Sequence, residues 1–127
     1  MVLATLAERV RAIGRFGVDT EFVGEGRYRT LLCVVQLVVG DDANLEVVVL
    51  DALDERTDLQ PLAGLLADPA ITVVVHAGRQ DVALLRRYLQ TEVTNIFDTQ
   101  IAAGFAGLPA QAGYETLLRE VLGVRVQ

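Results

Sequence analysis

Two acidic side chains stand two residues apart in an otherwise apolar segment near the start of the chain. Asp19 and Glu21 lie between Val18 and Phe22, with Thr20 separating them. Residues two apart in a β-strand project from the same face, so both carboxylates would point to one side and could share a cation. A solvent-exposed strand end is the simpler interpretation, but acids within a core strand generally require a partner or a cation. The spacing alone therefore leaves a metal site and a structural role open.

A third carboxylate follows a second apolar segment. Asp81 falls in the first turn of the helix predicted after the apolar residues 71–75. The junction between a buried strand and the next helix is where α/β sheets usually form their sites. An acid in a first helical turn is also stabilised by the helix dipole, by about 0.3–1 kcal/mol, with no catalytic role. Taken by itself, Asp81 is more simply explained by the dipole.

The elements that must position these acids follow from the apolar pattern. Residues 17–22, 31–39 and 45–50 are short runs rich in valine and leucine, separated by glycine-containing polar turns. Such runs predict an antiparallel three-stranded meander. An amphipathic helix is expected before them, over residues 1–15, because apolar and charged residues alternate there at helical spacing.

The second half of the chain changes to strand–helix alternation. Asp58 is expected to cap a short helix with Pro61 in its first turn, and residues 71–75 to form a strand buried on both faces. Further helices are predicted over 78–90, 99–106 and 114–122, the last ended by Gly123, with a very short strand at 96–97. The expected fold class is α/β, with a mixed sheet covered by helices.

Length and composition set the class of protein. The 127 residues suffice for one domain and not for two, so residues 1–127 are expected to form a single globular unit. No apolar run reaches the roughly 18 residues of a membrane helix, and the single cysteine, Cys33, has no partner for a disulfide, so we expect a cytoplasmic protein that does not bind membranes. A net charge of −6 argues against a protein that binds nucleic acid over its whole surface. It is compatible with a nuclease whose acidic residues bind cations.

Four segments in order carry a resemblance to a known family. Residues 16–22 (FGVDTEF) resemble the first exonuclease motif of the DEDD superfamily, and residues 31–37 (LLCVVQL) resemble the strand that follows it in ribonuclease D. Residues 76–82 (HAGRQDV) are similar to the second motif, and residues 96–103 (IFDTQIAA) to a segment typical of ribonuclease D. Together the matched segments extend over nearly the whole chain.

The resemblance implies a ribonuclease H-like fold and a 3′→5′ exoribonuclease that hydrolyses phosphodiester bonds with two divalent cations, Mg²⁺ or Mn²⁺. It places Asp19, Glu21 and Asp81 as metal ligands and catalytic residues. It also places Glu21, Thr20 and Phe22 beside the terminal nucleotide of a single-stranded 3′ end of RNA, with DNA as the other substrate that the sequence allows. Carboxylates suit this role because both cations prefer hard oxygen ligands.

One part of the family pattern is missing from the chain. The resemblance calls for a third motif, in which an aspartate follows a tyrosine by four residues, and none of Tyr28, Tyr88 and Tyr114 has an aspartate at that position. We therefore expect a C-terminally truncated domain with three of four acids and with weak or absent activity. The absent segment should leave apolar surface exposed, in keeping with the hydrophobic fraction of 52%, and a homodimer through that surface is expected.

Other candidate residues have simpler roles. His76 is expected to be a hydrogen-bonded residue at a strand end, and Asp98 a helix N-cap in preference to a metal ligand. Arg27 and Arg29 could contact phosphate. Two alternative functions stay open: a non-catalytic nucleic-acid-binding or interaction module of the same fold, and an α/β domain whose acids are only structural.

Overall fold

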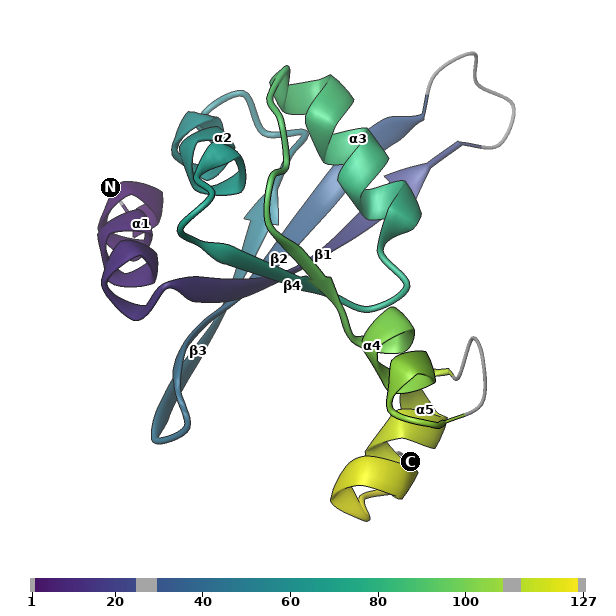
Figure 1. The fold of residues 1–127 in the computed structure, drawn as a ribbon. Coiled ribbons are helices and arrows are strands. Elements are labelled where there is room, and N and C mark those ends of the chain that lie inside the picture. Colours follow the sequence, from purple (N-terminus) through teal and green to yellow (C-terminus); the bar gives the residue numbers. More distant parts are fainter. Residues whose placement is uncertain (1, 25–29, 109–112, 126–127) are drawn as a thin grey trace.

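The computed structural model describes residues 2–24, 30–108 and 113–125 of the chain (Figure 1). Its elements in chain order are α1 (Val2–Ile13), β1 (Arg15–Val23), β2 (Leu31–Asp41), β3 (Asn44–Asp51), α2 (Gln60–Ala67), β4 (Thr72–Val75), α3 (Arg79–Leu89), β5 (Ile96–Asp98), α4 (Thr99–Phe105), α5 (Tyr114–Leu117) and the π-helical turn η1 (Leu118–Leu122). Five strands form one sheet in the order β3-β2-β1-β4-β5. The predicted α/β class is confirmed.

The sheet is mixed, as predicted. Strands β1, β2 and β3 form the antiparallel meander, and β4 and β5 add to it in parallel. Strand β4 pairs with β1 only at residues 15–17 of β1, so the rest of β1 has no strand beside it on that side. The β2–β3 turn depends on Gly40, whose φ of 140° brings the backbone so close to Asn44 that a Cβ would lie 1.8 Å from its carbonyl oxygen.

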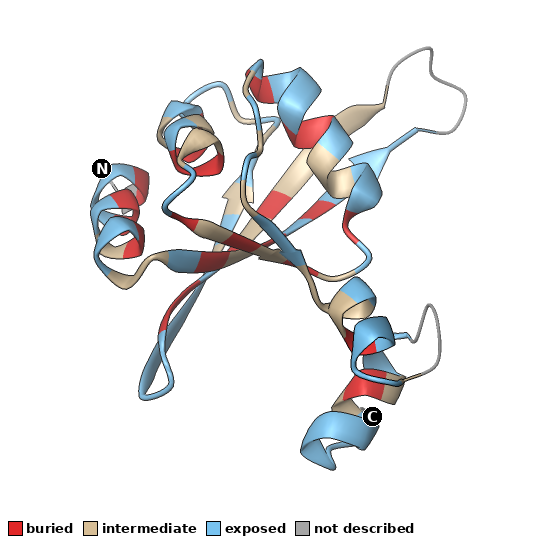
Figure 2. Cartoon of the chain, in the orientation of Figure 1, coloured by how far each residue is buried: buried red, intermediate tan, exposed pale blue. Residues whose placement is uncertain are grey.

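Helices α1, α2 and α3 cover one face of the sheet (Figure 1). Apolar side chains of these helices and of β1, β2 and β4 form the main core, and Figure 2 shows the buried residues gathered between the two layers. Fully buried members of this core include Phe16, Leu37, Leu62, Val73 and Leu85. The apolar residues recur at the helical period in the helices and at every second position in the strands, so they all face one core.

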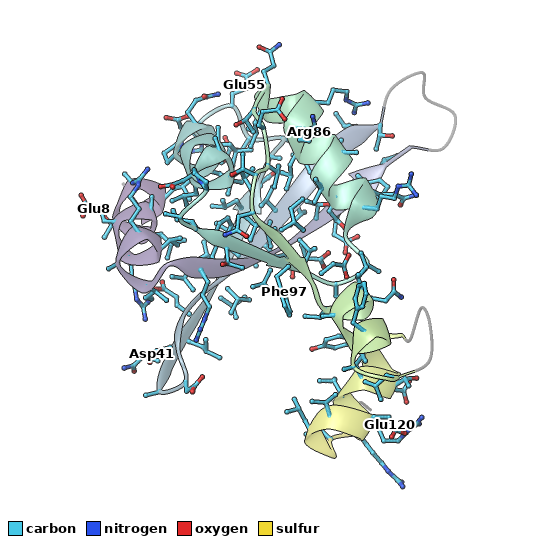
Figure 3. All side chains as sticks on the ribbon, viewed as in Figure 1. Glu8, Asp41, Glu55, Arg86, Phe97 and Glu120 are labelled. Atoms are coloured by element: carbon cyan, nitrogen blue, oxygen red, sulfur yellow. The ribbon has the colours of Figure 1, made fainter. Side chains whose placement is uncertain are left out.

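The opposite face of the sheet is not closed by helices in the described part of the chain. We call it the open face; it carries Gly17, Asp19, Glu21, Gln36, Val38, Leu45, Val47, Val49, Val74 and Phe97. Val47 and Val49 are 65% and 64% exposed, and Figure 3 shows Phe97 on the side of the sheet away from α2 and α3.

The prediction that residues 71–75 are buried on both faces is therefore wrong. Val73 and Val75 are buried, whereas Val74 is half-buried and faces a pocket of about 460 Å³ on the open face.

One predicted helix end differs in the structure, and another is confirmed. Asp58 is not the N-cap of α2, because the helix begins at Gln60 and Leu59 occupies the cap position; the Asp58 carboxylate instead accepts the N–H of Gln60 at 3.0 Å. The predicted helix over 114–122 is present as α5 and η1, and Gly123 ends it in the left-handed conformation, with φ of 68°. Helices α4 and α5 pack through a second, small apolar cluster of Ala103, Leu117 and Leu108.

No helix among the described residues is long and apolar enough to cross a membrane.

Candidate functional site

The first two predicted acids lie on the open face of the sheet, as their spacing predicts. Asp19 is opposite Gln36 of β2, and Glu21 is opposite Val34. Both carboxylates are exposed, and neither forms a hydrogen bond or ion pair with any residue that the structure describes. They are therefore available to an external ligand and free to change rotamer.

Asp81 reaches the same strand from the first turn of α3. Its Oδ1 accepts two hydrogen bonds from Thr20, one from the backbone N–H at 3.1 Å and one from the side-chain hydroxyl. Thr20 is the residue between Asp19 and Glu21, so the third acid meets β1 at the point where the other two lie. The structure thus brings all three predicted residues to one short stretch of β1.

Thr20 itself has a different environment from the other residues predicted to contact substrate. Its side chain is only 5% exposed and faces the helices, and its hydroxyl and N–H are both directed to Asp81. Phe22, by contrast, is 37% exposed and borders a pocket, and Glu21 is open to solvent. A substrate contact for Thr20 stays a prediction, and its observed contacts are with Asp81.

The start of α3 is fixed by a close approach to β4. A Cβ on Gly78 would lie 2.5 Å from the Cβ of Val75, so only glycine allows the helix to begin this near the strand. Ala77 precedes it with a positive φ of 49°, a conformation that alanine rarely adopts. A sharp turn therefore places Asp81 beside β1 three residues after the glycine.

Asp98 holds that turn from the next strand. Its Oδ1 accepts the N–H groups of Ala77 and Gln100, both at 2.9 Å, and its Oδ2 accepts the N–H of Gly78 at 3.0 Å. Partial burial alone would raise the pKa of the Asp98 carboxyl, but the backbone N–H groups together outweigh it and hold the pKa below its ordinary value. The predicted N-cap role at α4 is confirmed, and the bonds to the turn before α3 are an addition that the sequence did not indicate.

His76 is the hydrogen-bonded residue that the sequence predicts. Its Nδ1 lies 2.7 Å from the hydroxyl of Thr99, which in turn donates to the carbonyl of Val75 at 3.2 Å. The imidazole also meets the ring of Tyr114 edge-on, with 5.7 Å between centroids. These contacts join the end of β4 to α4 and α5.

Two pockets flank the acids. The pocket of about 460 Å³ on the open face is lined by Asp19, Gln36, His76 and Tyr114 among others. A second pocket, of about 350 Å³, lies on the other side of β1 and is lined by Phe22, Thr30, Gln80, Ala83, Leu84 and Arg87. We call the second one the Phe22 pocket.

Sequence reasoning missed the basic residue of the Phe22 pocket. Gln80, Ala83, Leu84 and Arg87 follow helical spacing and so form one face of α3. Arg87 donates one N–H to the carbonyl of Thr30 at 2.5 Å, and no other partner of its guanidinium occurs in the described part of the chain. The one sequence signal for this position was that Arg87 lies seven residues after Gln80, which places both on the same helical face.

Arg27 and Arg29, the predicted phosphate contacts, lie outside the described residues.

The three acids fit a divalent cation in chemistry and only partly in arrangement. Asp19 and Glu21 offer unpaired oxygens, and Asp81 keeps its Oδ2 without a hydrogen bond within the described ranges. These are the hard donors that Mg²⁺ and Mn²⁺ prefer. However, among residues 2–24, 30–108 and 113–125, no three acidic, histidine or cysteine side chains already stand together as a metal site.

Comparisons with known proteins identify the family of the chain. A family model described as 3′-5′ exonuclease matches residues 2–127. Ribonuclease D of Acidiphilium cryptum is 44% identical over 124 residues, which are 98% of this chain and 31% of the relative. The chain thus spans about a third of the length of the curated relatives that it matches.

Solved structures give the same result. The crystal structure of Escherichia coli RNase D, an exoribonuclease involved in structured RNA processing, matches with a TM-score of 0.84 and 35% identity over 98% of this chain and 32% of that one. Brucella melitensis NrnC with bound Mg²⁺ matches with a TM-score of 0.69 and 30% identity over 90% of this chain and 56% of that one. The shared arrangement is the ribonuclease H-like one that the sequence predicts.

The bonds of Asp98 predict a pH-dependent contribution to stability. Because its pKa is lowered in the folded state, the stabilisation is fully present above the unfolded value of about 3.9 and is lost as the pH falls through the folded pKa. Asp98→Asn removes the charge and one acceptor, so we expect a loss of about 1–2 kcal/mol in the free energy of unfolding at pH 7. Urea unfolding at pH 7 and pH 3 should show a much smaller loss at pH 3.

A matched control is Asp58→Asn, which alters an exposed carboxylate that accepts a single N–H. It should change the free energy of unfolding by less than about 0.5 kcal/mol at either pH. An equal effect of Asp98→Asn at both pH values would show that the carboxylate charge does not stabilise the turn.

Proposed function

The chain belongs to the ribonuclease D-type 3′-5′ exonucleases, and from this premise we propose that it is a divalent-metal-dependent exoribonuclease domain that removes nucleotides from the 3′ end of RNA. Residues 1–127 would act as one exonuclease-like domain. The proposal includes a cytoplasmic location.

The observation that carries this proposal is the contact between α3 and β1. Asp81 bonds to Thr20, and Thr20 stands between Asp19 and Glu21 in β1, so the third acid is anchored to the residue between two acids that lie 60 and more positions earlier in the chain. Two acids that were merely surface charges on a strand would not require a third acid, such as Asp81, beside that strand. The exposed carboxylates of Asp19 and Glu21, which have no partner among the described residues, argue against the alternative of purely structural acids.

Asp19, Glu21 and Asp81 would hold the cations through their oxygens. Two bound divalent cations would supply activation of the attacking water and stabilisation of the leaving 3′ oxygen. Mg²⁺ is the first choice, since it is bound in the NrnC structure, and Mn²⁺ has the same preference for carboxylates. The chain's own contribution is to fix the acids on β1 and α3 relative to one another.

The Phe22 pocket is the proposed site for the end of the nucleic acid. Phe22 follows Glu21 directly and offers a partly exposed ring for stacking, and Gln80 precedes Asp81 and offers an amide. Arg87, at the far end of the pocket, could pair with a backbone phosphate. The guanidinium gives this acidic chain a local positive charge beside its carboxylates. Glu21, the neighbour of Phe22 on the open face, would contact the terminal nucleotide.

A second function is favoured by one observation. The described residues hold no ready arrangement of three metal-binding side chains. A non-catalytic module that binds a 3′ end without cleaving it would have the same pockets. Such a module would bind RNA equally well after removal of metal, whereas the exonuclease would not.

The apolar open face supports self-association. Val38, Val47 and Val49 stand in the neighbouring strands β2 and β3 of the open face, and β3, which carries two of them, is an edge strand. Long apolar edge strands pair readily with a second chain. We therefore propose a homodimer that covers this face.

A nuclease assay tests the proposed activity. Single-stranded RNA labelled at its 5′ end, incubated with Mn²⁺, should shorten slowly from the 3′ end, and DNA of the same sequence shows whether the 2′-hydroxyl matters. Asp19→Ala should lower the rate by at least roughly 100-fold, because a direct ligand matters no less than an outer-shell partner. Asp42→Ala, an exposed acid of the β2–β3 turn, should leave the rate unchanged.

Shortening that survives Asp19→Ala would rule out the proposed site. Metal-independent binding of RNA with no shortening in any condition would favour the non-catalytic module.

The Phe22 pocket yields a prediction for RNA binding. Arg87→Ala should weaken binding of a single-stranded RNA, measured with Ca²⁺ to prevent cleavage, by roughly five- to tenfold and should lower the salt dependence by about one counterion. Arg86→Ala is the matched control: Arg86 lies on the same helix (Figure 3) but pairs with Glu92 at 3.0 Å. Equal effects of the two substitutions would exclude a phosphate site at Arg87.

Sedimentation at several concentrations tests the homodimer. The sedimentation coefficient of the natural chain should rise with concentration, and a variant with Val47→Glu and Val49→Glu should stay monomeric, because opposed like charges prevent the apolar faces from meeting. Leu53→Glu, at an exposed leucine outside the sheet, serves as the control and should associate like the natural chain. A natural chain that is strictly monomeric at every concentration would contradict the proposal.

A further inference from the structure

Thr20 lies between Asp19 and Glu21 in β1 and donates two hydrogen bonds to Asp81. We propose that Thr20 is a positioning residue, whose N–H and hydroxyl together set the orientation of the Asp81 carboxylate for cation binding. This inference rests on the proposed function, in which Asp81 is a metal ligand. It gives Thr20 a role that differs from a contact with the substrate.

The backbone part of the contact exists because β4 is short. Pairing of β4 with β1 ends at Gly17 and Val74, so the edge of β1 beyond Gly17 has N–H groups without a strand partner. An unpaired backbone N–H in a partly buried position costs free energy unless another acceptor replaces the strand. Asp81 provides that acceptor for Thr20, which fixes the carboxylate at this point of the edge.

The side-chain part of the contact depends on the hydroxyl. Thr20 faces the helix-covered side of the sheet and is 5% exposed, so its hydroxyl needs a partner within the protein. It donates to the same Oδ1 that accepts the N–H. Valine has nearly the same shape and could not donate, whereas serine could. Threonine therefore combines packing against the core with a hydrogen bond to the acid.

Two donors on a single oxygen leave the other oxygen available. Asp81 Oδ2 has no hydrogen bond to the residues that the structure describes, and the two bonds at Oδ1 restrict rotation of the carboxylate. Outer-shell donors of this kind orient metal-binding carboxylates, and their loss typically costs 10–100-fold in metal affinity. The Asp81 carboxylate thus has its Oδ1 fixed by Thr20 and its Oδ2 available to a cation.

The test is calorimetric titration of the full 127-residue chain with Mn²⁺, which needs no turnover. Thr20→Val should weaken Mn²⁺ binding by roughly tenfold, and Thr20→Ser should restore it to within about threefold. Each variant is also unfolded with urea, so that a loss of folding is distinguished from a loss of affinity. Asp81→Asn and the double variant complete a cycle, in which Thr20→Val should cause no further loss once Asp81 is replaced.

The outcomes separate the two proposals. Unchanged affinity in Thr20→Val, or a loss that persists in full in the Asp81→Asn background, would overturn the positioning role while leaving the metal site intact. Unchanged affinity in Asp81→Asn would instead overturn the proposed function at Asp81, and the inference with it. Weak binding by Thr20→Ser equal to that of Thr20→Val would also overturn the role of the hydroxyl.

Discussion

The position of Asp81 beside β1 depends on the short parallel pairing between β1 and β4. This pairing spans three residues of β1, and its early end leaves the remaining edge of β1 to be satisfied by α3 in place of a strand. If β4 continued, it would occupy the position in which Asp81 now meets Thr20, and the third acid would be excluded. The tight start of α3 at Gly78 and the bonds of Asp98 to that turn both follow from the need to bring the helix to this edge.

Much of the fold could be predicted because its signals are local. The alternating apolar residues of β1 and β2, the turn at Gly40 and the Gly123 helix end are all encoded within a few residues. Asp19, Glu21 and Asp81 could be predicted as candidates because spacing of two on a strand and a first-turn position on a helix have fixed geometric meaning. Their meeting at Thr20 was not predictable from spacing, since it depends on where β4 stops pairing.

The features that sequence reasoning missed arise from contacts between distant segments. Asp98 reads as a local helix cap, and only the fold shows that it also accepts N–H groups 20 and more residues earlier. Arg87 has no distinctive neighbours in the sequence, and its position at the Phe22 pocket follows from helix packing. The half-burial of Val74 has the same origin, because an apolar run indicates which residues can be buried and not whether a second layer covers them.

The contact between Thr20 and Asp81 also has a consequence for the order of folding. It joins residues 61 positions apart, and the turn that supports it needs Asp98, a further 17 residues along the chain. The meander of β1, β2 and β3 closes only short loops and can form early, whereas contacts of high sequence separation form slowly because a long segment must first lose its freedom. The acids would therefore come together late, after β5 has docked, and a growing chain would carry a folded meander before it carried a site.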